Sequence, residues 1–329
     1  QIRHNYGEAH ALIVFSVVGM MVLASANSLV TIFVGLETMS ICLYVLTGMV
    51  RESPTANESA LKYFLLGAFS TGFFLYGIAL LYGATGTMYL NEIGAGLETA
   101  GRPIMFWVGV GLLLIGFLFK VSAVPFHMWT PDAYQGAPTT ITAFMSTGSK
   151  TAAFASLILV LYYALDVSVA QWQWALALVA VITMVLGNVV ALAQTNVKRM
   201  LAYSAIAHAG YVLTGLAAAN TAGYSGALYY LLVYTLMNIG AFGVMAELEW
   251  DEEQGCSQTL DSLAGIGYRK PILGVVMGIC MFSLVGFPPL GGFIGKWKVF
   301  SAAISGGMTW LAIIGVITSV ISAGYYLRV

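Results

Sequence analysis

The chain has 329 residues, of which 59% are hydrophobic and only 8% are charged. A soluble domain carries about 25% charged residues, so this composition excludes a soluble globular protein. The mean hydropathy of +0.86 instead indicates an integral membrane protein. With 13 basic and 14 acidic residues, the chain has no positive excess for binding nucleic acid.

The apolar residues are grouped into segments that are long enough to cross a bilayer. A spanning helix needs about 20 mostly apolar residues, whereas the strands of a membrane barrel are shorter and alternate in polarity. These segments are continuous, so we predict an all-α polytopic membrane protein with about ten transmembrane helices. The expected spans are 9–26, 28–49, 60–83, 104–130, 138–164, 172–194, 198–218, 222–248, 272–302 and 308–328.

The basic residues of the loops lie almost entirely on one side of the predicted membrane. Seven are on one side, and only Arg102 is on the other. Basic loops stay on the cytoplasmic side, so we expect the seven to face the cytoplasm. The acidic run 247–253 lies on the same side and is expected to be a solvated loop. The seven residues are Arg3, Arg51, Lys198, Arg199, Arg269, Lys270 and Arg328.

Two of the segments carry proline and glycine in mid-span, close to lysine. They read FLFKVSAVPFHMWTPDAYQGAP and FSLVGFPPLGGFIGKWKVF. Proline removes a helical hydrogen bond, and broken backbone at membrane depth needs cover from protein or a water-filled cavity. Pro125 and Pro288 are 163 residues apart, and this shift aligns the ends of the two halves. We predict two inverted five-helix repeats, 9–165 and 172–329, each with one broken helix; two unrelated proline kinks are the alternative.

Four charged residues inside the spans are the main candidates for a functional site. A charge at bilayer depth is costly and usually lies on a polar interior path, which suggests ion or proton movement. The candidates are Glu37, Lys120, Lys150 and Lys296, and Lys120 is the natural partner of the Glu37 carboxylate. Lys298 faces another direction than Lys296 and is the weaker choice. The alternatives are a lysine that extends to the interface and an ion pair that never switches.

Three further polar residues are weaker candidates for a relay. His127 and His208 titrate near neutral pH and lie in apolar surroundings, although a single histidine is more often a packing residue. Lys62, at the start of its span, is expected from its position alone to lie at the interface. No metal or nucleotide motif is found.

Four stretches together resemble the antiporter-like membrane subunits of respiratory complex I. These are FKVSAVPFHMWTPDAYQGAP, KRMLAYSAIAHAGY, GFPPLGGFIGKW and KYFLLGAFSTGFFLYGIALLYGATG. The last stretch is most similar to the N type of this family, and the resemblance covers nearly the whole chain. It implies the fold of two inverted repeats, with additional helices expected at both ends.

The resemblance also implies which residues move protons. The family's glutamate falls on Glu37, and its lysines fall on Lys120, Lys150 and Lys296, or less well on Lys298. Lys62, His127 and His208 match polar positions of the family's central axis. The implied function is proton translocation driven by quinone reduction, with Glu37 tuning the charge of Lys120.

The resemblance implies that the redox cofactors lie elsewhere. NADH, FMN, iron–sulfur clusters and quinone are expected in other subunits, and Cys42, Cys256 and Cys280 are too few for a four-cysteine cluster site. The expected partners are other membrane subunits, including a second antiporter-like subunit, and the lipid of a bacterial inner membrane. A cation/proton antiporter subunit, a membrane-bound hydrogenase subunit and a purely structural scaffold are the alternatives.

Overall fold

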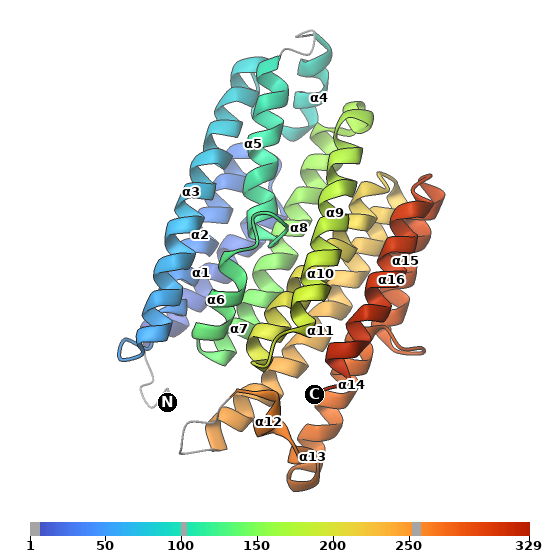
Figure 1. The fold of residues 1–329 in the computed structure, drawn as a ribbon. Coiled ribbons are helices and arrows are strands. Elements are labelled where there is room, and N and C mark those ends of the chain that lie inside the picture. The colour runs from blue at the N-terminus through green and yellow to red at the C-terminus, as the bar shows by residue number, and fades with distance from the viewer. Residues whose placement is uncertain (1–6, 100–103, 252–257) are drawn as a thin grey trace.

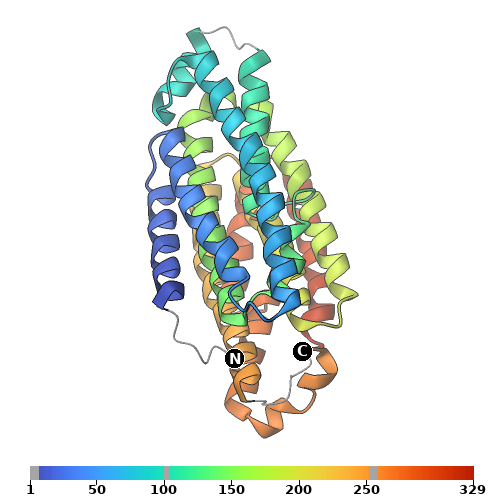
Figure 2. The same ribbon diagram turned by 90° about the vertical axis from the view of Figure 1, so that its left-hand side faces the viewer.

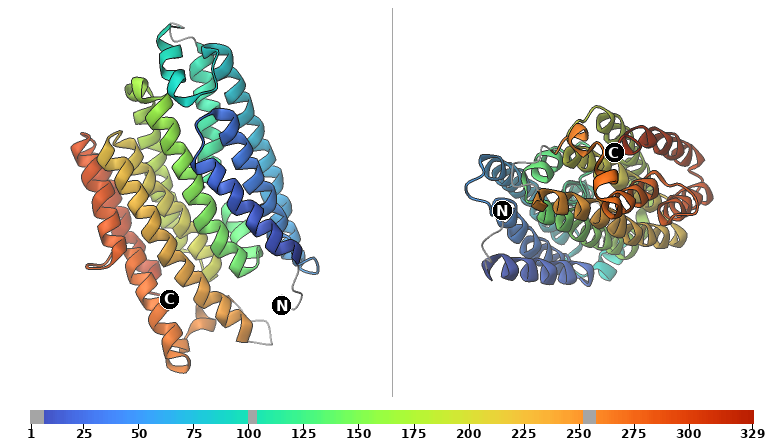
Figure 3. Two further views of the ribbon diagram at one scale, coloured as in Figure 1. Left: turned by 180° about the vertical axis from the view of Figure 1, so that it is seen from behind. Right: turned by 90° about the horizontal axis from the view of Figure 1, so that it is seen from below.

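The computed structural model describes residues 7–99, 104–251 and 258–329. Arg3, Arg102 and Cys256, together with residues 252–253 of the acidic run, lie outside these described residues. Most helices run along one direction and form an elongated bundle (Figure 1). Seen along that direction, the N-terminal helices occupy one end of the cross-section and the C-terminal helices the other (Figure 3).

The described helices match the ten predicted spans. Eight helical segments are long and apolar enough to cross a membrane, and the shorter apolar helices α5 and α14 are each continued by a second half-helix. The first part of the chain forms α1 (Gly7–Ala24), α2 (Leu29–Thr47), α3 (Pro54–Thr85), α4 (Leu90–Thr99), α5 (Ile104–Lys120), α6 (Trp129–Gly136), α7 (Thr139–Phe144) and α8 (Lys150–Leu159). The second part forms α9 (Val169–Leu192), α10 (Val197–Ala217), α11 (Thr221–Asp251), α12 (Leu260–Leu263), α13 (Ile266–Arg269), α14 (Pro271–Val285), α15 (Gly291–Ser305) and α16 (Thr309–Tyr326). Two π-helical turns, Met145–Ser149 and Val160–Ala164, flank α8.

Both predicted interruptions are present, and polar groups satisfy the backbone around them. The first lies between α5 and α6, where the Val124 amide donates to Thr183 Oγ1 at 3.0 Å and Trp129 Nε1 donates to the Phe119 carbonyl at 3.0 Å. The second lies between α14 and α15, where the Gly292 amide donates to Ser283 Oγ at 3.2 Å. These contacts replace helical hydrogen bonds, as buried backbone requires.

A shared pattern of caps and bridges relates the two halves. Ser28 caps α2 by accepting from the Thr31 amide, and an isolated bridge pairs Ser28 with Tyr89 after α3. Asn196 caps α10 in the same way, and a bridge pairs it with Thr259 after α11. The first bridge lies at the α4 end of the bundle and the second at the α12 end (Figures 1 and 2). The broken helices also run in opposite directions, so the halves are inverted; the boundaries 9–165 and 172–329 stay a prediction.

Helix α10 occupies the centre of the bundle. Nearly all its residues are buried, and it contacts α6, α9, α11, α15 and α16. At the periphery, α1 and α2 pack closely through Gly19 and Gly35. A Cβ added at Gly19 would lie 2.5 Å from the Met39 amide nitrogen, so a larger residue cannot be accommodated without moving a helix. The small-residue contact therefore fixes α2, which carries part of the site.

Candidate functional site

The first buried ammonium belongs to Lys120, the last residue of α5. Its side chain is 4% exposed, and its Nζ donates to Ser40 Oγ at 2.7 Å and to Tyr44 OH at 3.0 Å. Both hydroxyls belong to α2, where residues four apart share one face. A positive charge at the C-terminus of a helix is also favoured by the helix dipole. The interruption of α5 thus leaves Lys120 inside the bundle with neutral oxygen partners.

The direct ion pair predicted between Glu37 and Lys120 is not formed among the described residues. Glu37 is half-buried one turn before Ser40 on α2, and its Oε1 accepts from Thr71 Oγ1 at 2.7 Å. Ser40 and Tyr44 occupy the position next to the ammonium instead. Glu37 therefore lies on the same helix face as the ligands of Lys120 without touching it.

Lys150 supplies the second buried ammonium, at the start of α8. It is 2% exposed, donates from Nζ to the Ala205 carbonyl at 2.8 Å, and lies 5.8 Å from the centre of the Tyr134 ring. The π-helical turn Met145–Ser149 immediately precedes it. Such turns in a helix are frequent at functional sites because they redirect side chains.

Lys296 supplies the third buried ammonium, one turn after α15 begins. It is 5% exposed and donates to the Leu284 carbonyl at 3.0 Å, the Val285 carbonyl at 2.8 Å and Ser319 Oγ at 2.7 Å. These carbonyls belong to the C-terminal end of α14, which favours a cation. The Nζ atom also lies 4.7 Å from the centre of the Tyr211 ring. Gly286, with a φ of 89°, leaves space for the chain of Lys296, because a Cβ there would lie 3.0 Å from its Cδ.

Lys298 points away from this interior. Its side chain is exposed, and its Nζ lies 5.3 Å from the centre of the Tyr229 ring. The predicted choice of Lys296 over Lys298 as the interior residue therefore agrees with the geometry.

The two histidines differ in their surroundings. His208 on α10 is 2% exposed and is hydrogen-bonded at both ring nitrogens, to Tyr230 OH at 2.6 Å and to Tyr326 OH at 2.8 Å. His127 lies in the first break next to the exposed Pro125 and is half-buried. Its Nδ1 atom has no hydrogen-bond partner among the described residues. The structure thus places His208, and not His127, within a buried cluster of hydrogen-bonded side chains.

Lys62 lies outside the buried group. It is 46% exposed and forms ion pairs with Glu58 at 2.7 Å and Asp132 at 2.9 Å. Asp132 also binds Arg199 Nη1 at 2.7 Å. No contact among the described residues joins Lys62 to Lys120, and its interfacial position stays a prediction.

Sequence reasoning missed a further buried lysine. Lys198 was assigned to a loop, but it is 2% exposed and donates to the Ala137 carbonyl at 2.7 Å, with Glu249 Oε1 at 3.9 Å. Glu249 is also not in a solvated loop: it lies in α11, half-buried, and accepts from Thr139 Oγ1. Both residues stand at the edges of apolar runs, where composition resembles that of a loop. Only the packing of α10 against α6, and of α11 against α7, buries them.

Two asparagines in the middle of apolar segments could have been identified as site residues from the sequence. Asn188 in α9 and Asn238 in α11 are both fully buried in apolar segments. Asn188 Nδ2 donates to Tyr211 OH at 3.1 Å, and Asn238 Nδ2 donates to Ser146 Oγ at 2.7 Å. A polar side chain in the middle of a span faces the bundle interior.

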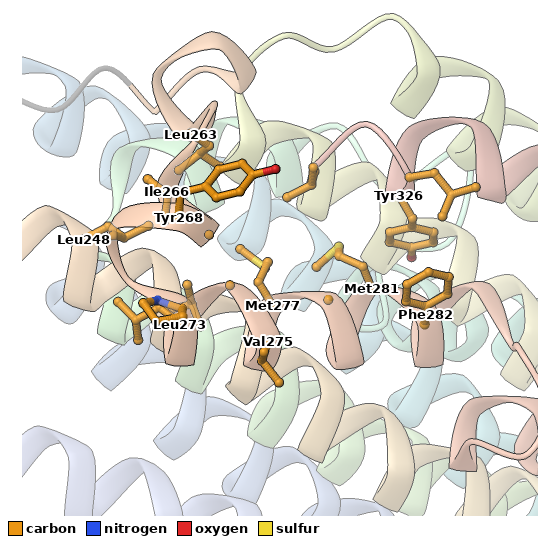
Figure 4. Close-up of a pocket in the computed structure, with 17 residues that line it drawn as sticks. Leu248, Leu263, Ile266, Tyr268, Leu273, Val275, Met277, Met281, Phe282 and Tyr326 are labelled. Carbon is orange, nitrogen blue, oxygen red and sulfur yellow. The ribbon is translucent and has the colours of Figure 1, made fainter.

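An apolar pocket adjoins the network but is not part of it. It has a volume of about 550 Å³ and is lined mainly by apolar residues of α11, α13, α14 and the end of α16. Figure 4 shows Tyr326 beside Met281 and Phe282 at one side of the pocket. The described residues of its lining carry no charged side chain.

Within the described ranges, no group of three His, Cys, Asp or Glu residues could hold a metal ion. In the described part of the chain, the spanning segments, two of them broken, and the buried ammonium groups of Lys120, Lys150 and Lys296 define a polytopic membrane protein of the transporter type. The family described as "NADH:quinone oxidoreductase/Mrp antiporter, TM" matches residues 26–322, and the chain belongs to this family.

Individual relatives agree with this assignment. The NADH-quinone oxidoreductase subunit N of Salinibacter ruber is 66% identical over 330 residues, which cover 100% of this chain and 66% of that protein. The protein of the same name from Trichlorobacter lovleyi is 52% identical, over 99% of this chain and 67% of that protein. The chain thus spans about two thirds of the length of these curated relatives.

Solved structures share the fold. A chain of respiratory complex I from Thermus thermophilus has a TM-score of 0.87 and 40% identity, over 99% of this chain and 70% of that chain. A chain of the Mrp complex from a Dietzia species has a TM-score of 0.87 at 24% identity, over 96% of this chain and 59% of that chain. The second similarity concerns the fold alone.

Proposed function

We propose that the chain is the proton-translocating, antiporter-like membrane subunit of an NADH–quinone oxidoreductase, of the N type. One face of α10 carries this proposal. The Ala205 carbonyl accepts from Lys150, the Tyr211 ring lies beside the ammonium of Lys296, and His208 lies between them in the sequence. Residues three apart are neighbours on a helix, so this face connects two buried lysines through a titratable side chain.

The buried lysines act as temporary proton carriers in this proposal. A proton enters one half of the chain, resides on Lys120, Lys150 or Lys296, and leaves by the other half. Hydroxyls hold the ammonium of Lys120, a carbonyl holds that of Lys150, and both kinds of group hold that of Lys296. Glu37, one helical turn before the Lys120 partner Ser40 on α2, tunes the charge of Lys120. Burial of an ammonium without function would be costly, because apolar residues of similar size would stabilise the bundle better.

The redox steps belong to other subunits. NADH, FMN, iron–sulfur clusters and quinone are expected there, and their reduction drives proton movement here. The partners are other membrane subunits, including a second antiporter-like subunit. The chain lies in the bacterial inner membrane, with the end that carries Arg51, Arg199 and Arg269 toward the cytoplasm.

A cation/proton antiporter subunit, a membrane-bound hydrogenase subunit and a scaffold are the competing functions. Relatives at 66% and 52% identity are named as subunit N, which favours the first proposal over the antiporter and hydrogenase readings. A scaffold gives no reason to bury the ammonium groups of Lys120, Lys150 and Lys296 inside the bundle.

The test is the Lys150→Ala variant of the full-length protein in its assembled complex, reconstituted in proteoliposomes. We expect proton translocation coupled to quinone reduction to fall at least about tenfold, the effect of roughly 1.4 kcal/mol on a barrier. The control is Arg51→Gln, which removes an exposed charge and is expected to leave translocation unchanged. Normal translocation in an assembled Lys150→Ala complex would contradict the proposal, and replacement of proton by sodium movement would favour an antiporter.

A further inference from the structure

The central histidine has a phenol at each ring nitrogen. Tyr230 OH lies 2.6 Å from Nδ1 of His208, and Tyr326 OH lies 2.8 Å from Nε2. The three side chains come from α11, α10 and α16, and each is no more than 2% exposed. A neutral imidazole has one donor and one acceptor nitrogen, so one tyrosine donates to the ring while the other accepts from it.

The Tyr230 side of this triad leads toward Lys150. Tyr230, Tyr234 and Asn238 follow each other at four-residue spacing on one face of α11. Asn238 Nδ2 donates to Tyr234 OH at 3.0 Å and to Ser146 Oγ at 2.7 Å. Ser146 belongs to the π-helical turn that precedes Lys150.

The Tyr326 side leads toward Lys296. The Tyr325 and Tyr326 rings lie 4.3 Å apart, and Tyr325 OH donates to Asn188 Oδ1 at 3.0 Å. Asn188 Nδ2 in turn donates at 3.1 Å to the hydroxyl of Tyr211, whose ring lies beside the Lys296 ammonium. Polar groups from α9, α10 and α16 therefore gather around the histidine and the third lysine, with a ring contact and not a hydrogen bond at the step from Tyr326 to Tyr325.

We propose that Tyr230, His208 and Tyr326 form a tautomeric proton relay between the Lys150 and Lys296 sides; this rests on the proposed function. Tyr230 takes an incoming proton while giving its own to Nδ1. Nε2 gives its proton to the Tyr326 oxygen, which passes its own proton toward Ser204 Oγ, its other hydrogen-bond partner. One proton enters and one leaves, no group keeps a charge, and the ring ends in the other tautomer. Return to the first tautomer prepares the next transfer.

The test removes each hydroxyl and keeps the ring, with Tyr230→Phe and Tyr326→Phe in the assembled complex. We expect either variant to lower coupled proton translocation about tenfold. The matched control is Tyr229→Phe, since Tyr229 is the neighbour of Tyr230 but faces Lys298 on the outer side of α15. Normal translocation in both phenol variants, with translocation lost in Lys150→Ala, would overturn the relay and leave the proposed function intact.

A second readout separates a relay from a packing role. The nitrogen-15 resonances of His208 can be assigned by comparison with a His208→Gln sample. Tyr230→Phe and Tyr326→Phe remove partners of opposite nitrogens and should shift the tautomer ratio in opposite directions. An unchanged ratio in both variants would overturn the relay even if translocation fell. Normal translocation in Lys150→Ala would instead remove the proposed function itself.

Discussion

The two broken helices hold their lysines in different ways. Lys120 ends the half-helix before the first break, and two hydroxyls, of Ser40 and Tyr44, accept from its ammonium. Lys296 belongs to the half-helix after the second break and reaches back to two carbonyls of α14. Hydroxyls can rotate and can donate as well as accept, whereas carbonyls only accept. The first site, whose hydrogen-bond partners in the described part of the chain are all hydroxyls, can therefore adapt more readily when its lysine changes charge than the second, where one hydroxyl, of Ser319, joins the two carbonyls.

Helices α2 and α10 show the same difference between the halves. Nine residues after the N-cap, α2 carries Glu37 and α10 carries Ala205; twelve residues after the N-cap, α2 carries Ser40 and α10 carries His208. The first half thus places a carboxyl group on the helix face that holds its lysine, and the second places an imidazole ring at the position that matches Ser40. In the proposed function, the first half thus tunes the charge of Lys120, and the second half transfers protons through His208.

The largest effect is expected from Lys120→Ala, which removes the ammonium of the first half. Coupled proton translocation and quinone reduction should both fall at least about tenfold while the complex still assembles. Translocation by proteoliposomes, with assembly checked on native gels, measures this. A well-assembled variant with normal translocation would show that the first break carries no proton.

A smaller effect is expected from Glu37→Gln, which removes the charge but keeps an oxygen for Thr71. Translocation should fall on the order of fivefold, equivalent to about 1 kcal/mol. Glu37→Asp should be milder, because it keeps the charge. The comparison would fail if Glu37→Gln were as severe as Lys120→Ala or if the aspartate variant were the worse of the two.

Substitution of Ser40 and Ser319 tests whether the two ammonium groups differ in how many hydrogen-bond acceptors remain when one is removed. Ser40→Ala leaves Lys120 with one observed acceptor, whereas Ser319→Ala leaves Lys296 with two carbonyls. A hydrogen bond to a charged group contributes about 1.5–3 kcal/mol, so the first variant should lose more translocation than the second. Initial rates in the same proteoliposome assay decide this, and equal losses would mean that the two sites are equivalent.

The smallest effect is expected from Lys62→Gln. Lys62 is 46% exposed, and exposed ion pairs contribute about 0–1 kcal/mol. Lys198→Gln should destabilise the bundle more, by about 1–3 kcal/mol, because the Ala137 carbonyl that it binds is left without this donor. Thermal unfolding in detergent compares the two variants, and a larger loss for Lys62→Gln would place Lys62 among the buried groups.

The sequence predicted what depends on composition and spacing along the chain. The apolar segments, the breaks near Pro125 and Pro288 and the interior position of three lysines were all predicted, because each reflects the cost of polar groups in a membrane. Contacts between distant helices were not predicted. The binding of Lys120 to Ser40 instead of Glu37, and the burial of Lys198, depend on packing between helices that are far apart in the sequence. The spacing of residues along the chain does not predict such packing.

The central claim is that protons pass through interior lysines. The most direct measurement is the rate of proton translocation coupled to NADH oxidation, in complexes with Lys296→Ala and Lys298→Ala. These lysines are two residues apart on α15, and only the first faces the interior. The account predicts a loss of at least about tenfold for Lys296→Ala and no change for Lys298→Ala. Equal rates in the two variants, or loss only in Lys298→Ala, would contradict it.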